Sequence, residues 1–167
     1  MPTVLVSDTN IWIDFERAGK LQLIFRLPYQ FSTTDFVASE LGNEVCTQLV
    51  ALGLSVVSLD SNGIRELQQL KLELRNPSLA DLSCYYVAKR DGSTLLSGDR
   101  KLREAAQAAN IEVFGTLWML DRLVEHQILA AEDAAASLEA IIKANGRLPA
   151  NECAARLKRW RPKDGVS

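Results

Sequence analysis

The chain has little histidine, little cysteine and no long hydrophobic run. His126 is the one histidine among 167 residues, which excludes catalysis by a pair of imidazoles and argues against a histidine-rich zinc site. Cys46, Cys84 and Cys153 include no CxxC pair, so we expect free thiols in a reducing compartment. No apolar run approaches the roughly 18 residues of a membrane span, and the short apolar start at residues 4–6 is not a signal sequence. We therefore expect a cytoplasmic protein without membrane association.

A strong net charge of either sign is also lacking. The formal charge is −2, so the composition alone does not indicate a nucleic-acid partner. Acids that hold divalent cations lower this formal charge, because the sum leaves the metal out. The length and the 47% hydrophobic content are typical of one soluble domain with its own core.

Short β-rich runs alternate along the chain with longer stretches of helical period. We expect strands at residues 3–7, 29–33, 54–59, 94–97 and 112–114. We expect helices at residues 11–27 (with a break at Gly19), 36–52, 61–75, 78–90, 101–110, 116–127, 132–145 and 151–160. This alternation predicts an α/β fold, a three-layer α/β/α sandwich with a parallel sheet. We expect one domain over residues 1–167, with a core of about 3–127 and a C-terminal helical appendage of about 128–161.

Two aspartates directly follow predicted strands. Asp8 follows residues 4–7 and Asp99 follows residues 95–98. Ligands of open parallel sheets bind at the carboxyl ends of strands, where the strand order reverses. If the first and fourth strands are neighbours at that reversal, the two aspartates face each other across one crevice. Aspartate is a poor strand residue, but each could also serve only to cap the following helix.

Two further acids lie near predicted helix starts. Glu40 is one turn into the helix after the second strand, and Asp81 is in the first turn after Ser78. Each has a simpler explanation, since Ser78-x-x-Asp81 fits a capping pattern and Glu40 alone is typical of a solvated surface. The combination of the four acids is what indicates a site.

Four sequence blocks carry a resemblance to a known family. They are Val4–Asn10 (VLVSDTN), Val37–Leu41 (VASEL), Leu79–Leu82 (LADL) with Ala88–Gly92 (AKRDG), and Leu95–Leu102 (LLSGDRKL). In this order they resemble the motifs of PIN domains, and among these the VapC toxins of bacterial toxin–antitoxin pairs. The likeness spans residues 4–114, and the last block is the most specific.

The resemblance implies a five-stranded sheet of order 3-2-1-4-5 and an acidic pocket for Mg²⁺ or Mn²⁺. Its four acids are Asp8, Glu40, Asp81 and Asp99. We assign metal ligation to Asp8, Asp81 and Asp99, while Glu40 either ligates or accepts a proton from the attacking water.

Polar neighbours of the pocket are implied as well. Thr9, Asn10 and Ser97 would hydrogen-bond around the acids. Many PIN domains have a fifth acid, for which Asp14 and Asp35 are candidates, although we expect both at the surface. The resemblance further implies a homodimer and a cognate antitoxin protein whose segment blocks the pocket.

The chemistry of such a pocket is consistent with the residue inventory. Four close carboxylates raise one another's pKa, and a hard divalent cation with oxygen ligands relieves that repulsion. A metal-activated water can then attack a phosphodiester without a histidine or serine nucleophile. We expect a metal-dependent endoribonuclease, the toxin of a toxin–antitoxin pair; the RNA target and cleavage site are not predicted.

Basic residues in two places are candidates for holding RNA. Arg100, Lys101 and Arg103 follow Asp99 and could contact phosphates. The end of the chain, residues 156–163 (RLKRWRPK), combines basic groups with Trp160, as in single-stranded nucleic-acid binding. A solvated basic helix end is the favoured interpretation there, and we expect Trp12 and Trp118 in the core or an interface.

Two alternatives remain open. A haloacid-dehalogenase-like phosphatase also has an aspartate after its first strand, but it needs a second aspartate two residues later, where this chain has Asn10. A catalytically silent PIN scaffold acting as a binding module is the other alternative. Such scaffolds usually lose pocket acids, and this chain keeps four.

Overall fold

One parallel sheet lies at the centre of the computed structural model, which describes residues 3–145 and 147–163. Its strands are β1 (Thr3–Ser7), β2 (Tyr29–Thr34), β3 (Ser55–Val57), β4 (Thr94–Leu96) and β5 (Val113–Phe114). Their order is β3-β2-β1-β4-β5, and every neighbouring pair is parallel. The predicted α/β fold and strand order are thereby confirmed.

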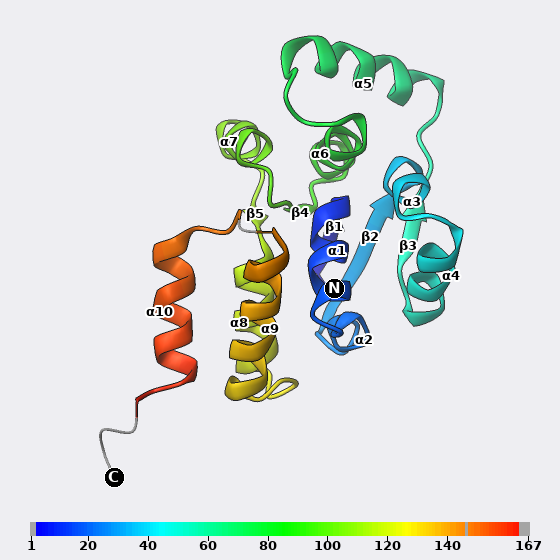
Figure 1. Cartoon of the computed structure of the whole chain (residues 1–167). Helices are drawn as coiled ribbons and strands as arrows, with labels where there is room; N and C mark the ends of the chain where they lie inside the picture. The colour runs from blue at the N-terminus through cyan, green and yellow to red at the C-terminus, as the bar shows by residue number, and fades with distance from the viewer. Residues whose placement is uncertain (1–2, 146, 164–167) are drawn as a thin grey trace.

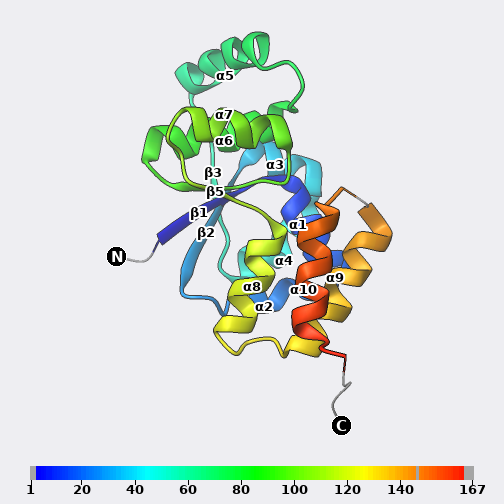
Figure 2. The same cartoon turned by 90° about the vertical axis from the view of Figure 1, so that its left-hand side faces the viewer.

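Helices cover both faces of the sheet. They are α1 (Thr9–Arg17), α2 (Leu21–Ile24), α3 (Asp35–Leu41), α4 (Asn43–Leu52), α5 (Ser61–Glu73), α6 (Leu79–Asp91), α7 (Arg100–Ala108), α8 (Thr116–Glu125), α9 (Ala131–Asn145) and α10 (Ala150–Trp160). Helices α5, α6 and α7 lie on one side of the sheet, and α1, α2, α4, α8 and α9 lie on the other (Figures 1 and 2). In the described part of the chain, no helix is long and apolar enough to cross a membrane.

The central strands are apolar because both of their faces are covered. Leu5 and Val6 of β1 and Leu95 and Leu96 of β4 are buried, as expected for parallel strands between two helical layers. Helix α6 crosses this sheet and contacts β1, β2 and β4. Most of its residues are therefore buried, Asp81 among them.

The helix predicted over residues 36–52 is interrupted, which corrects that expectation. Helix α3 ends at Leu41 and α4 begins at Asn43, with Gly42 between them at φ 89° and ψ 161°. This backbone region is essentially restricted to glycine. The break places Glu40 in the last turn of a short helix that begins directly after β2.

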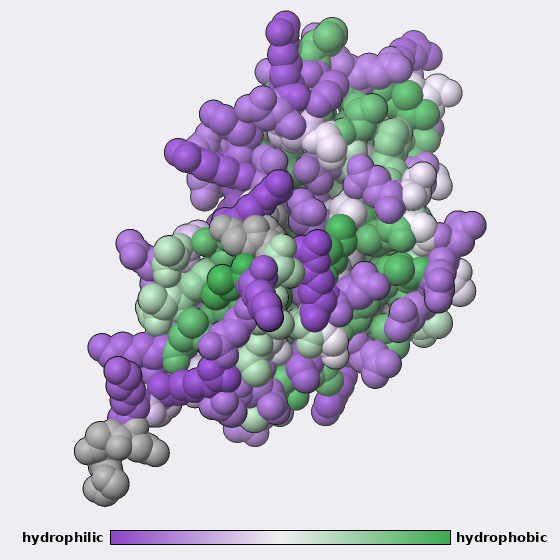
Figure 3. Space-filling view, in the orientation of Figure 1, coloured by the Kyte–Doolittle hydropathy of each residue, from purple (hydrophilic) through white to green (hydrophobic). Residues whose placement is uncertain are grey.

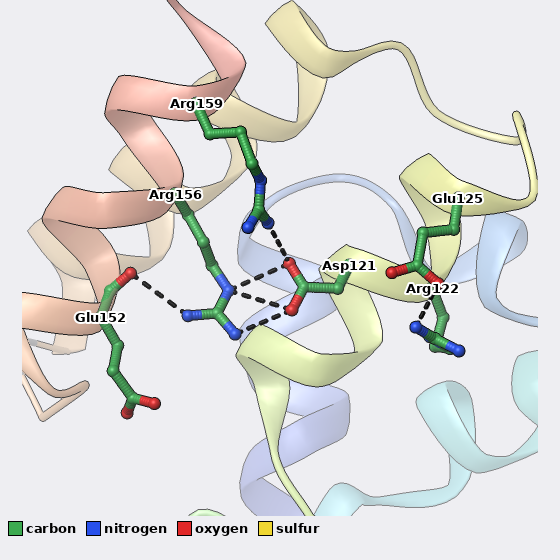
Figure 4. Close-up of polar contacts among 6 residues, drawn as sticks. All are labelled: Asp121, Arg122, Glu125, Glu152, Arg156 and Arg159. Carbon is green, nitrogen blue, oxygen red and sulfur yellow. Dashed lines mark hydrogen bonds and ion pairs between the residues drawn. The ribbon is translucent and has the colours of Figure 1, made fainter.

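The C-terminal helices pack into the same core as the sheet. Helix α9 contacts α1 and α8, and its Ala134, Leu138 and Ile141 are fully buried. Helix α10 packs on α9 and is tied to α8 by Arg156, which pairs with Asp121 at 2.7 Å (Figure 4). Residues after 127 therefore help to build the central core.

Candidate active site

Asp8 joins the end of β1 to the start of α1 at the edge of the sheet. Its carboxylate accepts a hydrogen bond from the backbone N–H of Ile11 (3.2 Å), which caps α1, and another from the Ser97 hydroxyl (2.6 Å). Its own backbone N–H donates to the carbonyl of Leu96 at the end of β4 (3.0 Å). The side chain is completely buried, between the two strands where the order reverses.

Asp99 occupies the matching position after β4. Its carboxylate accepts from the backbone N–H of Leu102 (2.8 Å) and caps α7. Its backbone N–H donates to the Ser97 hydroxyl oxygen (3.1 Å), the same hydroxyl that donates to Asp8. The Asp99 carboxylate both caps α7 and lies near enough to Asp81 for its charge to raise the pKa of that acid, so capping does not exclude a shared site.

Asp81 and Glu40 come from α6 and α3, two helices that contact each other and β2. Asp81 is buried in the first turn of α6, where its backbone N–H donates to the Ser78 hydroxyl (3.1 Å). Glu40 is exposed, and its carboxylate accepts from the Thr9 hydroxyl at 2.6 Å. Ser78 therefore caps α6 as expected, and this cap uses the backbone N–H of Asp81.

Electrostatic repulsion couples the four acids, which we call the acidic pocket. Burial, and then the charge of Asp81, raise the pKa of Asp8 from 3.8 to about 7. Burial, and then the charges of Asp99 and Glu40, raise the pKa of Asp81 to about 6. Among the described residues, no lysine, arginine or histidine forms an ion pair with any of the four. The negative charge of the pocket therefore has no ion-pair partner among the described residues.

The donor atoms of the acidic pocket are of the kind that a hard divalent cation binds. Carboxylate oxygens are the ligands that Mg²⁺ and Mn²⁺ prefer. In the described part of the chain, no three acidic, cysteine or histidine side chains are close enough to form a metal-binding cluster. Mg²⁺ usually keeps several waters and binds through one or two carboxylates together with substrate phosphates, so it does not require a closed cage of protein ligands.

The polar residues expected around the pocket differ in what they contact. Ser97 and Thr9 each donate to an acid, at Asp8 and Glu40 respectively. Asn10 is half-buried, and its side chain makes none of the hydrogen bonds found among the described residues.

A buried polar layer beneath the pocket was missed by the sequence analysis. The Thr34 and Ser83 hydroxyls are 2.6 Å apart, and the Thr33 hydroxyl donates to the Ser7 carbonyl (2.7 Å). The Cys84 thiol, also buried, donates to that same carbonyl (3.3 Å). The signal that could have revealed this layer is the run of three polar residues, Ser32 to Thr34, that ends β2, where all three are buried.

The two candidates for a fifth acid differ in their surroundings. Asp14 was expected at the surface, but it is buried in α1 and accepts from the Thr116 hydroxyl at 2.8 Å. The contact with Thr116 joins α1 to the start of α8, 102 positions along the chain, which the local sequence pattern does not reveal. Asp35 is half-buried, and its carboxylate accepts from the N–H of Phe36 at the start of α3.

The basic residues that were candidates for RNA binding differ in whether they form ion pairs with acidic side chains. Arg100 and Lys101 are exposed and pair with Glu104, whereas Arg103 is half-buried and forms no ion pair in the described part of the chain. The basic C-terminal end is compensated internally, with its arginines paired as follows: Arg156 and Arg159 with Asp121, and Arg161 with Glu132 and Glu139.

The three tryptophans considered as candidates for base stacking or for the core, Trp12, Trp118 and Trp160, are packed against other residues and are not free to stack on bases. Trp160 and Trp12 are buried. Trp118 is half-buried and stacks on Phe114 with ring centroids 4.2 Å apart. The arginines of the C-terminal end are thus paired within the fold rather than simply solvated, and Trp160 belongs to the core.

Fold and site together define an α/β protein with an acidic pocket at the carboxyl edge of a parallel sheet. The sequence matches the family described as DUF3368, a PIN domain, over residues 4–162. The chain therefore belongs to the PIN-domain family, as the four blocks predicted. PIN domains are typically metal-dependent nucleases, so the chain has the fold of that class of enzyme.

A solved structure supports the fold. It is a PilT N-terminus domain protein from the hyperthermophilic archaeon Sulfolobus solfataricus P2, with 15% sequence identity and a TM-score of 0.50. The similarity covers 74% of this chain and 96% of that one. Among curated proteins, no match was found.

Proposed function

We propose that the protein is a Mg²⁺- or Mn²⁺-dependent endoribonuclease. The observation that carries this proposal is the uncompensated acidic pocket, in which burial and mutual repulsion raise the pKa values of Asp8 and Asp81. Such a cluster of unpaired acids at the carboxyl edge of a parallel sheet is costly for the fold and is positioned where ligands of such sheets bind.

In this proposal each residue of the pocket has a distinct role. Asp8, Asp81 and Asp99 would supply carboxylate ligands to the cation, which would have to draw them closer together than they lie without it, and Ser97 orients the carboxylate of Asp8 through its 2.6 Å hydrogen bond. A bound divalent cation lowers the pKa of a coordinated water and stabilises charge on the leaving oxygen. Glu40 is exposed and held by Thr9, so it can accept a proton from the attacking water and release it to solvent.

Cleavage assays on RNA test the nuclease proposal. We expect structured and single-stranded RNAs to be cut in Mg²⁺ or Mn²⁺, to remain intact in EDTA, and to remain intact with the Asp8→Asn variant. That substitution keeps the side-chain shape and removes a charge that the cation needs. Full activity of the variant at matched purity would contradict the mechanism. Phosphatase activity on small phosphomonoesters, without RNA cleavage, would favour the dehalogenase-like alternative.

We further propose that the chain is the toxin of a toxin–antitoxin pair and acts as a homodimer. The first part is supported by the resemblance of the four sequence blocks to those of VapC toxins. Exposed apolar side chains of α5 and α6, namely Ile64, Leu72 and Leu79, give a surface that a second copy could cover, and Figure 3 shows apolar residues on this side of the molecule. Induced expression should arrest growth, and the Asp8→Asn variant should not. Gel filtration at tens of micromolar should give a dimer, and a monomer there would contradict the dimer proposal.

A further inference from the structure

A groove of about 500 Å³ begins at the edge of the acidic pocket. Gly98, which joins Ser97 to Asp99, is one of its lining residues, and the opposite wall includes Arg147 and Pro149 before α10. Helix α7 and the start of α8 form its remaining sides. Arg156 fixes α10 against α8 by its bidentate pairing with Asp121 (Figure 4), so the wall on the α10 side is held in place.

The lining of this groove is positive, next to a pocket that is negative. Four arginines line it, Arg100, Arg103, Arg147 and Arg156, together with two glutamates, Glu104 and Glu152. Arg156 is neutralised by Asp121, and Arg100 pairs with Glu104. Arg103 and Arg147 form no ion pair in the described part of the chain, so two guanidinium groups remain available to a ligand. The surface over α7, at the upper left of Figure 3, is hydrophilic.

The guanidinium of Arg103 lies against Gly115, which also lines the groove. A Cβ on Gly115 would be 3.2 Å from Arg103 Nη1 and 3.4 Å from the Ser97 carbonyl oxygen. The guanidinium is therefore near the backbone of Ser97, the serine whose hydroxyl donates to Asp8. A half-buried, positioned arginine loses less conformational freedom when it binds a phosphate in a bidentate way than a fully mobile one does.

We propose that this groove binds the sugar–phosphate backbone of the RNA strand that adjoins the scissile phosphate, with Arg103 and Arg147 contacting one phosphate each. The inference rests on the proposed nuclease function and extends it to the path of the substrate. The acidic pocket repels an anionic strand and the groove attracts it. In this proposal the groove therefore binds the strand, and the acidic pocket cleaves it. The class of ligand is single-stranded RNA, recognised through its phosphates rather than its bases, because the Trp118 ring is stacked on Phe114.

Fluorescence anisotropy with labelled oligouridylate in EDTA tests the groove without requiring cleavage. We expect Arg103→Gln and Arg147→Gln each to weaken binding, and the double variant to lower the salt dependence as well. Each phosphate contact on a single strand contributes about 0.7 to the slope of log K against log salt concentration, so the slope of the double variant should fall by about 1.4. Arg65→Gln on α5, another exposed arginine without an ion pair among the described residues, is the matched control and should bind as the wild type does.

Equal affinity and salt slope in the Arg103 and Arg147 variants and in the control would overturn the proposal, as would a wild type that binds no oligouridylate. Polyglutamate competing as well as polyuridylate would also overturn it, because the occupant would then be an acidic protein segment. Arg147 is exposed, so its variant reports on the groove even if Arg103→Gln fails to fold. If the arginine variants lose RNA binding but the wild type cleaves no RNA in Mn²⁺, the groove proposal stands and the nuclease proposal is wrong. If the wild type cleaves RNA but the variants bind it as tightly as the wild type does, the nuclease proposal stands and the groove proposal is wrong.

Discussion

At the scale of single residues, Asp8 combines a structural and a chemical role. Its carboxylate caps α1 through Ile11 and accepts the Ser97 hydroxyl, yet burial and the charge of Asp81 penalise its ionised form. Asparagine could serve the capping role equally well. The aspartate is therefore explained by the charge that it brings to the pocket, and that charge should have a measurable cost in the metal-free protein.

The cost of this charge should appear as a pH-dependent difference between wild type and Asp8→Asn in EDTA. The pKa of Asp8 is about 7 in the folded chain against an ordinary 3.8, so the folded state keeps this proton while the unfolded state loses it. The contribution of Asp8 to the free energy of unfolding is therefore largest below pH 4 and is lost as the pH rises to about 7. At pH 8 the variant should be more stable by on the order of 4 kcal/mol, with a much smaller gain at pH 4.

Urea unfolding at the two pH values measures this difference. A variant whose stability relative to wild type does not change between pH 4 and pH 8 would show that Asp8 is not held as a protonated acid in the metal-free fold.

At the scale of elements, the path of the chain around Glu40 depends on one glycine. Gly42 adopts φ 89° and ψ 161° between α3 and α4, and a Cβ there would meet no atom within 4 Å. Any cost of a side chain at this position must therefore come from the backbone and not from crowding.

Gly42→Ala should accordingly destabilise the fold by about 1–3 kcal/mol, the usual cost of this backbone region for a residue with a Cβ. Gly98→Ala is the matched control, because its φ lies outside the positive range and a Cβ there also meets nothing. The control should stay within about 0.5 kcal/mol of wild type. Thermal or urea unfolding of both variants compares them, and equal losses would contradict a backbone origin.

The elements show what local sequence could and could not predict. Asp8 and Asp99 were located correctly after β1 and β4 because short, largely apolar runs end just before them, and parallel strands place such positions at one edge. The break at Gly42 was missed because the apolar spacing of α3 continues into α4, and glycine within such a pattern is often tolerated. Asp14 was expected at the surface because its partner Thr116 belongs to α8, 102 positions along the chain, and local sequence does not show such a contact.

At the scale of the whole molecule, a few ion pairs connect the C-terminal helices to the sheet domain. Asp121 of α8 binds both Arg156 and Arg159 of α10, and the Asp121 and Arg156 side chains are only 16% and 17% exposed (Figure 4). Arg122 and Glu125, on the same helix, form a more exposed pair.

Asp121→Asn should lower the free energy of unfolding by about 2 kcal/mol, because it leaves the poorly solvated Arg156 without its counter-charge. Glu125→Gln removes the more exposed pair and should cost no more than about 0.5 kcal/mol. The urea midpoints of the two variants measure the contrast. Similar small losses in both would mean that the Asp121 pair does not fix α10 in place.

The central claim is that the four acids form a divalent-cation pocket, and Mn²⁺-dependent melting of wild type and Asp99→Asn tests it most directly. Wild type should gain about 2.7 kcal/mol when free Mn²⁺ reaches a hundred times its dissociation constant, and Asp99→Asn should lose most of this gain. Asp60→Asn is the matched control, since Asp60 caps α5 through Gly63 as Asp99 caps α7 through Leu102, and it should respond to Mn²⁺ as wild type does. Equal responses of all three proteins, or no response of the wild type, would contradict the account.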